Sequence, residues 1–379
     1  MSFNFCFHAR KMIFRTFLIL VVAVIYSEAQ NSCELIEWTG GQFDWPNDAT
    51  KSIYRSSGRY IPKNIIGTRA QVWKDEIFVA LPRYKPGTPV TLGKIGLKQK
   101  GCEAVIEPYP CWASQEESDI NALQSVVDLY LDENNILWVL DTGVVNSMEQ
   151  PIRRSPPKVV AINITNGKKV KVLDLCGLVA QASRLQYLVV EYAPDGRPFV
   201  YVSDAATRSI LVFDVAGNKG YRVVLPKLVT NCRRDVLYIA LIHKANCCNY
   251  LVITYLSGAR IFQIRTDYLR AGCAAGKIQD LGAKGGKIVV LGTDLGSALF
   301  FRFEGKPEVY RWEVESLFKD YQLVYKSPEN YLASHAFADV GRRRIRVLES
   351  NFPDYIENTV GCGASQRVAL MISPINSPN

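Results

Sequence analysis

The sequence has little histidine and none of the short motifs that mark common hydrolase and redox sites. Only His8, His243 and His335 occur among the 379 residues, which disfavours most histidine-based zinc sites and leaves few bases for a catalytic triad. No C-x-x-C pair occurs, so thioredoxin-like and zinc-ribbon sites are excluded. No G-x-S-x-G elbow occurs, so an α/β-hydrolase nucleophile is excluded as well.

Long apolar runs are also missing, except near the N-terminus. Three basic residues precede the apolar run FLILVVAVIY (17–26), and small residues surround Ala29. This order is typical of a secretory signal peptide, so we expect residues 1–29 to be cleaved and the mature protein to be secreted into the extracellular space. An uncleaved signal anchor is the alternative. No later segment is apolar for about 20 residues, so no membrane partner is expected.

Composition and charge indicate a globular chain with an excess of positive charge. Hydrophobic residues make up 48% and charged residues 21%, which excludes wholesale disorder, and the formal net charge is +9. We expect the basic clusters at 168–171 and 342–346 to lie on solvated faces. A secreted protein rarely meets nucleic acid, so no nucleic-acid partner is expected, and an anionic surface or polysaccharide fits the charge better.

Ten cysteines are present, and nine remain after cleavage of the predicted signal peptide. In an oxidising compartment most should pair, while the odd count leaves at least one thiol free or joined to another chain. The oligomeric state therefore stays open. The triplet Asn163-Ile164-Thr165 is a glycosylation acceptor, which predicts a glycoprotein with its glycan on Asn163.

A hairpin-like unit recurs along the chain. A β-rich stretch, a polar turn and a second apolar stretch appear at 70–82, 125–141, 188–204, 235–255, 287–304 and 333–349. The second strands are anchored on Phe78, Trp138, Tyr201, Val252, Phe300 and Arg346, with gaps of 60, 63, 51, 48 and 46 residues. This spacing predicts an all-β fold, a disulfide-stabilised six-bladed β-propeller formed by residues 30–379 as one domain. Two β-sandwiches in tandem are the alternative.

Closure of such a ring requires the two ends of the chain to meet. Either a strand or a disulfide between Cys33 and Cys362 could join them. The N-terminal lead-in and the C-terminal tail outside the ring should both be short.

Candidate chemistry lies where the inner strands face the central channel. His243 borders a cysteine-rich turn and should be exposed, whereas His335 opens the last inner strand and is a candidate for ligand binding or proton transfer. Calcium would need oxygen ligands before the inner strands, but Gln124, Tyr187 and Lys287 stand at three such places and only Asp235 is a good ligand. No metal or cofactor is therefore predicted.

Several motifs in order are similar to one family. They include PRYKPGTPVTL (82–92), LWVLDTG (137–143), SRLQYLVVEY (183–192) and RVLESNF (346–352). The ordered combination resembles the insect Yellow and major royal jelly protein family, near its yellow-e branch. The family usually has a cysteine where Asn134 stands here, and Cys247-Cys248 looks like an addition.

The resemblance implies a secreted six-bladed propeller with roles around cuticle pigmentation and melanin formation from dopa and dopamine. Some members resemble dopachrome-converting enzymes, salivary members capture biogenic amines in the central cavity, and royal jelly members are nutritive or signalling proteins. Fold alone does not choose among these roles.

The first hypothesis is a non-catalytic protein of the pigmentation pathway that binds a biogenic amine or dopa-derived small molecule in the channel. Asp235 would pair with the amine, other polar side chains would bond the ring hydroxyls, and two residues of the last motif would close the pocket. The predicted ligand residues are Gln124, Tyr187, Asp235, His335, Asn351 and Phe352. The alternatives are a dopachrome isomerase-like enzyme with His335 as base, and a nutritive or structural protein without a ligand.

Overall fold

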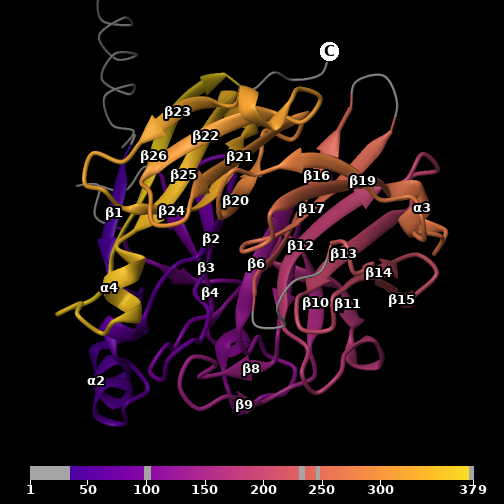
Figure 1. Cartoon of the computed structure of the whole chain (residues 1–379). Helices are drawn as coiled ribbons and strands as arrows, with labels where there is room; N and C mark the ends of the chain where they lie inside the picture. The colour runs from indigo at the N-terminus through magenta and orange to yellow at the C-terminus, as the bar shows by residue number, and fades with distance from the viewer. Residues whose placement is uncertain (1–34, 98–103, 230–234, 245–247, 375–379) are drawn as a thin grey trace, which may run out of the picture.

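Six four-stranded antiparallel sheets follow one another around a ring (Figure 1). The computed structural model describes residues 35–97, 104–229, 235–244 and 248–374. The innermost strands of neighbouring sheets pack side by side in chain order, and the last packs against the first. The predicted all-β, six-bladed β-propeller is therefore confirmed. The predicted signal peptide lies outside the described residues.

Each blade runs from an inner strand to an outer one, with the first strand of the chain added to the last blade. The first three blades are β2 (Arg69–Trp73), β3 (Glu76–Ala80), β4 (Leu92–Gly96), β5 (Glu107–Pro108); β6 (Val126–Leu131), β7 (Ile136–Asp141), β10 (Lys158–Asn163), β11 (Lys168–Asp174); β12 (Leu185–Tyr192), β13 (Pro198–Asp204), β14 (Ser209–Asp214), β15 (Lys219–Val224). The last three are β16 (Leu237–His243), β17 (Asn249–Tyr255), β18 (Arg260–Arg265), β19 (Gln279–Ala283); β20 (Ile288–Thr293), β21 (Ala298–Phe303), β22 (Glu308–Glu313), β23 (Gln322–Lys326); β24 (Leu332–Asp339), β25 (Arg344–Ser350), β26 (Ser365–Pro374), β1 (Ile36–Thr39).

Short elements lie at both ends of the ring. The hairpin of β8 (Val144–Val145) and β9 (Ile152–Arg153) and the helices α2 (Asp48–Ser56) and α4 (Phe352–Ile356) lie at one end, whereas α3 (Thr266–Arg270) lies at the other, between β18 and β19. The first helix is capped by Asn47, whose side-chain oxygen accepts a hydrogen bond from the N–H of Thr50 at 2.8 Å. Nowhere in the described segments is a helix long and apolar enough to cross a membrane.

Burial along a blade explains why the repeat could be seen in the sequence. The second strand β13 is buried at six of its seven positions, because neighbouring blades cover both of its faces. The outer strand β11 is mostly exposed and carries Lys168, Lys169 and Lys171, which protect its free edge. All six anchor residues fall on second strands, as predicted.

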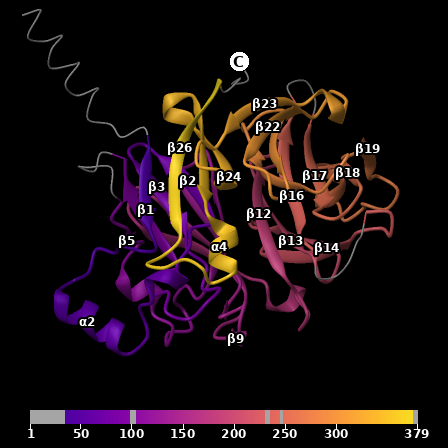
Figure 2. The same cartoon turned by 60° about the vertical axis from the view of Figure 1, so that its left-hand side comes forward.

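The ends of the chain meet through a strand. Figure 2 shows β1 (indigo) beside β26 (yellow), and Ile36 stands opposite Val368 in the antiparallel register. The side chains of Ile36 and Trp38 are 2% and 3% exposed, so β1 also completes the core of the last blade. Cys362 is an exposed free thiol, so of the two alternatives the strand, and not a disulfide between Cys33 and Cys362, joins the ends.

Free thiols predominate among the described cysteines. Cys111, Cys176, Cys273 and Cys362 are free and exposed, whereas Cys248 is disulfide-bonded. The ring is therefore held by strand pairing and apolar packing, and its expected stabilisation by several disulfides is not supported.

The arginine cluster at 342–346 is not a uniformly solvated face. Arg346 is 4% exposed, and its Nε lies 2.9 Å from the carboxylate of Asp339, which is itself buried. Arg342 reaches the neighbouring blade, where it pairs with Asp75 at 2.5 Å. The expectation of a solvated face was wrong here because the strand pairing of β25 places the side chain of Arg346 on a buried face of the sheet.

Candidate functional site

Five polar or aromatic side chains from five inner strands converge near the channel axis. We call them the central cluster: Arg69 of β2, Asp128 of β6, Tyr187 of β12, Tyr238 of β16 and His335 of β24. Arg69 Nε lies 3.3 Å from Asp128 Oδ1, and both side chains are less than 10% exposed. A buried ion pair in an otherwise apolar core costs free energy of desolvation, which makes the cluster a candidate functional site.

Asp128 is the carboxylate of this cluster. Its two oxygens accept the backbone N–H groups of Leu129 at 2.9 Å and Leu188 at 2.7 Å. Burial raises the pKa of Asp128 to about 6, although Arg69 and the two N–H groups act in the opposite direction. The carboxyl group therefore titrates close to neutral pH, as a general base requires.

Arg69 is held from three sides. It donates a hydrogen bond to the carbonyl oxygen of Ser334 and lies over the ring of Tyr187, with 4.8 Å between its Cζ and the ring centroid. Burial opposes its charge, but Tyr187 and Asp128 outweigh that effect and raise the pKa of Arg69 above its ordinary value. The guanidinium stays charged.

Tyr187 and Tyr238 form an aromatic wall beside the ion pair. Their ring centroids are 4.9 Å apart, with 33° between the planes. Burial, followed by the neighbouring tyrosine, raises the pKa of Tyr187 well above its ordinary value, so its hydroxyl remains a hydrogen-bond donor. Tyr84, on the loop after β3, is also electrostatically coupled to Tyr187, and burial raises its pKa to about 12.

His335 belongs to the cluster as an uncharged side chain. Its Nδ1 accepts the backbone N–H of Ala70 at 3.1 Å, so we assign the ring proton to Nε2. Its ring stacks on Phe337 with 5.3 Å between centroids. Burial and the nearby Arg69 hold the pKa of His335 well below its usual value, which makes it a weak base and a good Nε2–H donor.

Two other predicted ligand residues lie at the starts of inner strands and are engaged locally. Gln124 is buried before β6 and donates from Nε2 to the carbonyl oxygen of Asp119 at 2.8 Å. Asp235 precedes β16 and accepts the N–H groups of Val236 at 2.8 Å and Ser257 at 3.1 Å. Asp235 still acts electrostatically on Tyr238, so it borders the cluster.

Asn351 and Phe352 lie between β25 and β26. Asn351 Oδ1 accepts the N–H of Ser365 at 2.8 Å, which joins the two strands. Phe352 stacks on Tyr355 with 6.0 Å between centroids and packs, together with Tyr84, against one small apolar cluster. Phe352 and Tyr84 therefore border the same apolar cluster.

Sequence reasoning placed Tyr187 and His335 in the channel but missed Arg69, Asp128 and Tyr238. The available signal was a charged residue inside an apolar inner strand, as in VVDLYL (126–131) and RAQVW (69–73). Such a residue has to be paired or functional, because an isolated charge is rarely buried.

The five residues of the central cluster do not form an evident metal-binding site. No group of three or more histidine, cysteine or acidic side chains comes together in the part of the chain that the structure describes. His243 is half-buried, and its Nδ1 lies 2.9 Å from Asn249 Oδ1. It lies on β16 outside the central cluster.

Comparison with known proteins bears on this site. A family model described as major royal jelly protein matches residues 124–371. The chain belongs to the major royal jelly protein family. The matched range contains Asp128, Tyr187, Tyr238 and His335 of the central cluster and leaves Arg69 outside.

The relatives are distant and longer. The chain is 26% identical over 202 residues to dopaminechrome tautomerase of Drosophila melanogaster, 28% over 197 residues to major royal jelly protein 1 of Apis mellifera, and 26% over 194 residues to protein yellow of Drosophila melanogaster. These alignments cover 52%, 50% and 50% of this chain but only 44%, 45% and 36% of the relatives.

One solved structure supports the fold alone. An α-L-arabinofuranosidase from Fusarium graminearum, in complex with an iminosugar inhibitor, matches with a TM-score of 0.55 and 10% identity. The match covers 90% of this chain and 98% of that one.

Proposed function

We propose that this family member is a secreted protein that binds a catechol-derived small molecule, such as a biogenic amine or a dopa-derived compound, in the central channel. The observation that carries the proposal is the central cluster, where a carboxylate, a guanidinium and two stacked tyrosines converge from separate blades. Its place in cuticle pigmentation and melanin formation is part of the proposal.

The chemistry of the cluster suits such a ligand. Asp128 offers a negative charge for an amine, Arg69 and the tyrosine hydroxyls offer hydrogen bonds for ring oxygens, and the faces of Tyr187 and Tyr238 suit a flat ring. Tyr84 and Phe352 would stand at the entrance. Asp235 beside Tyr238 is a second acid that the amine could meet.

Secretion is supported by the leader-like N-terminus and by the disulfide at Cys248, since disulfides persist in oxidising compartments. The proposed glycosylation residue Asn163 lies at the turn after β10 and accepts the Thr165 hydroxyl at 2.6 Å.

A second candidate function is tautomerisation of a catechol-derived quinone, and the pKa of Asp128 near 6 favours it. Asp128 would take a proton from a ring carbon while a quinone oxygen gains one, so the product is an isomer and no oxidant is needed. Arg69 and Tyr187 would stabilise the developing negative oxygen. The name of the relative dopaminechrome tautomerase agrees with this chemistry.

The test combines calorimetric titration of the secreted protein with dopamine and an absorbance assay of dopaminechrome decay. We expect saturable binding that weakens at least about ten-fold in Asp128→Asn and in Tyr187→Phe, because each loses a direct contact. Lys219→Gln, on the outer strand β15, is the matched control and should bind like the wild type. Wild-type affinity in both cluster variants would contradict the proposed site.

The decay assay separates the two functions. Accelerated decay that rises through about pH 6 and disappears in Asp128→Asn would establish the tautomerase. If decay is lost in His335→Gln but kept in Asp128→Asn, His335 rather than Asp128 is the base. Binding of dopamine without accelerated decay would indicate a carrier. No response to dopamine or dopaminechrome would favour a nutritive or structural protein.

A further inference from the structure

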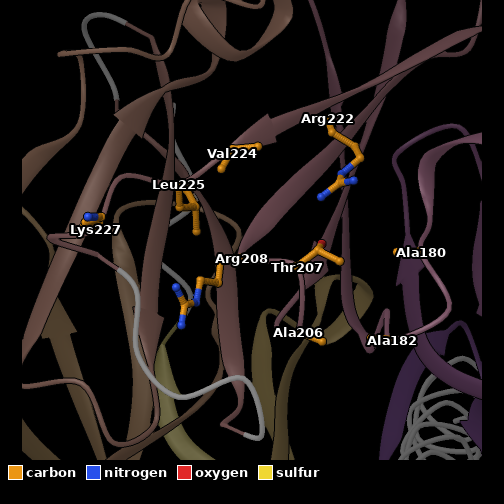
Figure 3. A pocket seen from close by; sticks show the side chains of 9 residues that line it. All are labelled: Ala180, Ala182, Ala206, Thr207, Arg208, Arg222, Val224, Leu225 and Lys227. Carbon is orange, nitrogen blue, oxygen red and sulfur yellow. The ribbon is translucent and has the colours of Figure 1, made fainter.

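A pocket lies away from the central cluster, on the outer part of the third blade. Its volume is about 510 Å³, which is within the range of small-molecule sites. It is lined by the segment before β12, the turn between β13 and β14, and the end of β15 (Figure 3). The lining residues are Ala180, Ala182, Ala206, Thr207, Arg208, Arg222, Val224, Leu225 and Lys227.

The charge of this pocket is of one sign. Arg208, Arg222 and Lys227 line it, and none of the described lining residues is acidic. The nearest acid in the turn, Asp204, is fully buried and already accepts hydrogen bonds from Ser183 Oγ at 2.5 Å and from Thr207 Oγ1 at 2.6 Å. The pocket therefore presents the positive charges of Arg208 and Arg222 to a ligand.

Arg208 is the most informative residue of the pocket. Its Nε is buried and has no hydrogen-bond partner among the described residues. A buried donor without a partner is costly, and such a group is commonly satisfied by an ordered water or ion. Arg222 lines the same pocket from the outer strand β15, as Figure 3 shows.

The backbone at Arg208 gives an independent indication. The turn from Asp204 to Ser209 has the same length as the turns 163–168 and 214–219, and its fifth residue has φ +56°. The other two turns place Gly167 and Asn218 at this left-handed position. Glycine and asparagine suit that conformation and arginine does not, so this chain keeps a guanidinium where local structure favours another residue.

The rest of the lining is apolar. Val224 is 66% exposed, and Leu225 and three alanines form the neighbouring wall. A second pocket of about 490 Å³, with Arg153 and Arg154 in its lining, adjoins this one through Ala180. The basic surface therefore extends from the third blade toward the second.

We propose that this pocket, which we call the basic pocket, binds a small organic anion. Arg208 and Arg222 hold its carboxylate or sulfate group, and Val224 and Leu225 cover its apolar body. The site is separate from the central cluster and opposite in charge preference, because the cluster is proposed to take an amine and the basic pocket takes an anion. The same anionic group could come from a free small molecule or from a sulfated glycan.

The test is calorimetric titration of the full mature protein with 4-nitrophenyl sulfate, inorganic sulfate, a neutral 4-nitrophenyl glucoside and a heparin-derived tetrasaccharide. We expect the aryl sulfate to bind at least ten-fold more tightly than inorganic sulfate or the glucoside. Tetrasaccharide binding that exceeds the aryl sulfate and is lost with Arg208 would identify a glycan as the source of the anion.

Two variants and a control make the assignment specific. Arg208→Asn should weaken aryl sulfate binding at least ten-fold without lowering the melting temperature, since asparagine suits the turn. Arg222→Gln should also weaken aryl sulfate binding. It keeps the test valid if Arg208→Asn, which changes the turn, misfolds. Lys219→Gln, on the same outer strand, should bind normally.

Two outcomes would overturn the proposal. One is equal binding of aryl sulfate by the wild type and both arginine variants. The other is equal binding of aryl sulfate and the neutral glucoside, which would remove the role of the charge. Dopamine binding should be unchanged in Arg208→Asn, so failure of the basic pocket is distinguishable from failure of the central cluster.

Discussion

At the scale of single residues, the central cluster shows how burial and pairing compete. Asp128 has an arginine beside it and two backbone N–H groups on its oxygens, yet burial dominates and its pKa lies near 6. His335, close to the same arginine, is driven to the neutral form. The cluster thus contains one permanent charge, on Arg69, and one carboxylate whose charge depends on pH near neutrality.

This balance predicts a pH-dependent stability. The pKa of Asp128 is about 6 in the folded chain against an ordinary value of 3.8. Folding therefore favours the protonated carboxyl, and this stabilisation of the folded state is fully present below about pH 4 and is lost as the pH rises through 6. Relative to Asp128→Asn, we expect the wild type to lose up to about 3 kcal/mol of unfolding free energy between pH 4 and 7.

Denaturant unfolding of both proteins at several pH values measures this difference. Taking the difference cancels the separate titration of His335, which both proteins keep. A difference that is constant across the range would show that Asp128 titrates at its ordinary pKa.

The sequence indicated part of this site. Tyr187 and His335 could be placed because they lie in the first halves of inner strands, and inner strands face the channel. Arg69 and Asp128 could not, because a polar residue in a strand belongs to either face until the register and the neighbouring blade are known. The same ambiguity made Arg346 look like a surface residue.

At the scale of elements, the hairpins were readable because the second strands are almost wholly buried. Their apolar runs stand out from the polar turns that separate them from the inner strands. The strand β5 has only two residues and β1 only four, which is too short for any periodicity.

The contact between inner strands depends on a glycine in β20. Gly292 has φ +152°, and a Cβ at that position would lie 2.0 Å from the carbonyl oxygen of Ala336 in β24. We expect Gly292→Ala to lower the unfolding free energy by roughly 2–4 kcal/mol, because the last two blades would have to separate.

Gly276→Ala is the matched control. Gly276 also has positive φ, +70°, but nothing lies within 4 Å of the added Cβ, so its cost should be limited to roughly 1 kcal/mol of backbone strain. Thermal unfolding of both variants measures the contrast. Equal destabilisation would refute the packing argument.

At the scale of the whole molecule, the ring depends on a strand from the opposite end of the chain. Trp38 is 3% exposed and packs with Phe43, Tyr60 and other residues of the first and last blades. Trp38→Ala should cost about 3–5 kcal/mol, since it both leaves a cavity and weakens the closing strand.

Thr39→Ala, at an exposed position of the same strand, should change stability by no more than about 0.5 kcal/mol. Chemical denaturation monitored by tryptophan fluorescence and circular dichroism compares the two. A Trp38 variant as stable as the Thr39 variant would mean that β1 only decorates the last blade.

The pairing of β1 with β26 also constrains how the protein is made. Ile36 is among the first residues of the propeller to leave the ribosome, and its partner Val368 is among the last. During synthesis the opening strand therefore has to wait, with its backbone groups unpaired, while five complete blades and most of the sixth assemble behind it. A nascent chain halted before β26 would leave the edges of β1 and β25 unpaired, and both edges are covered together once β26 has been made.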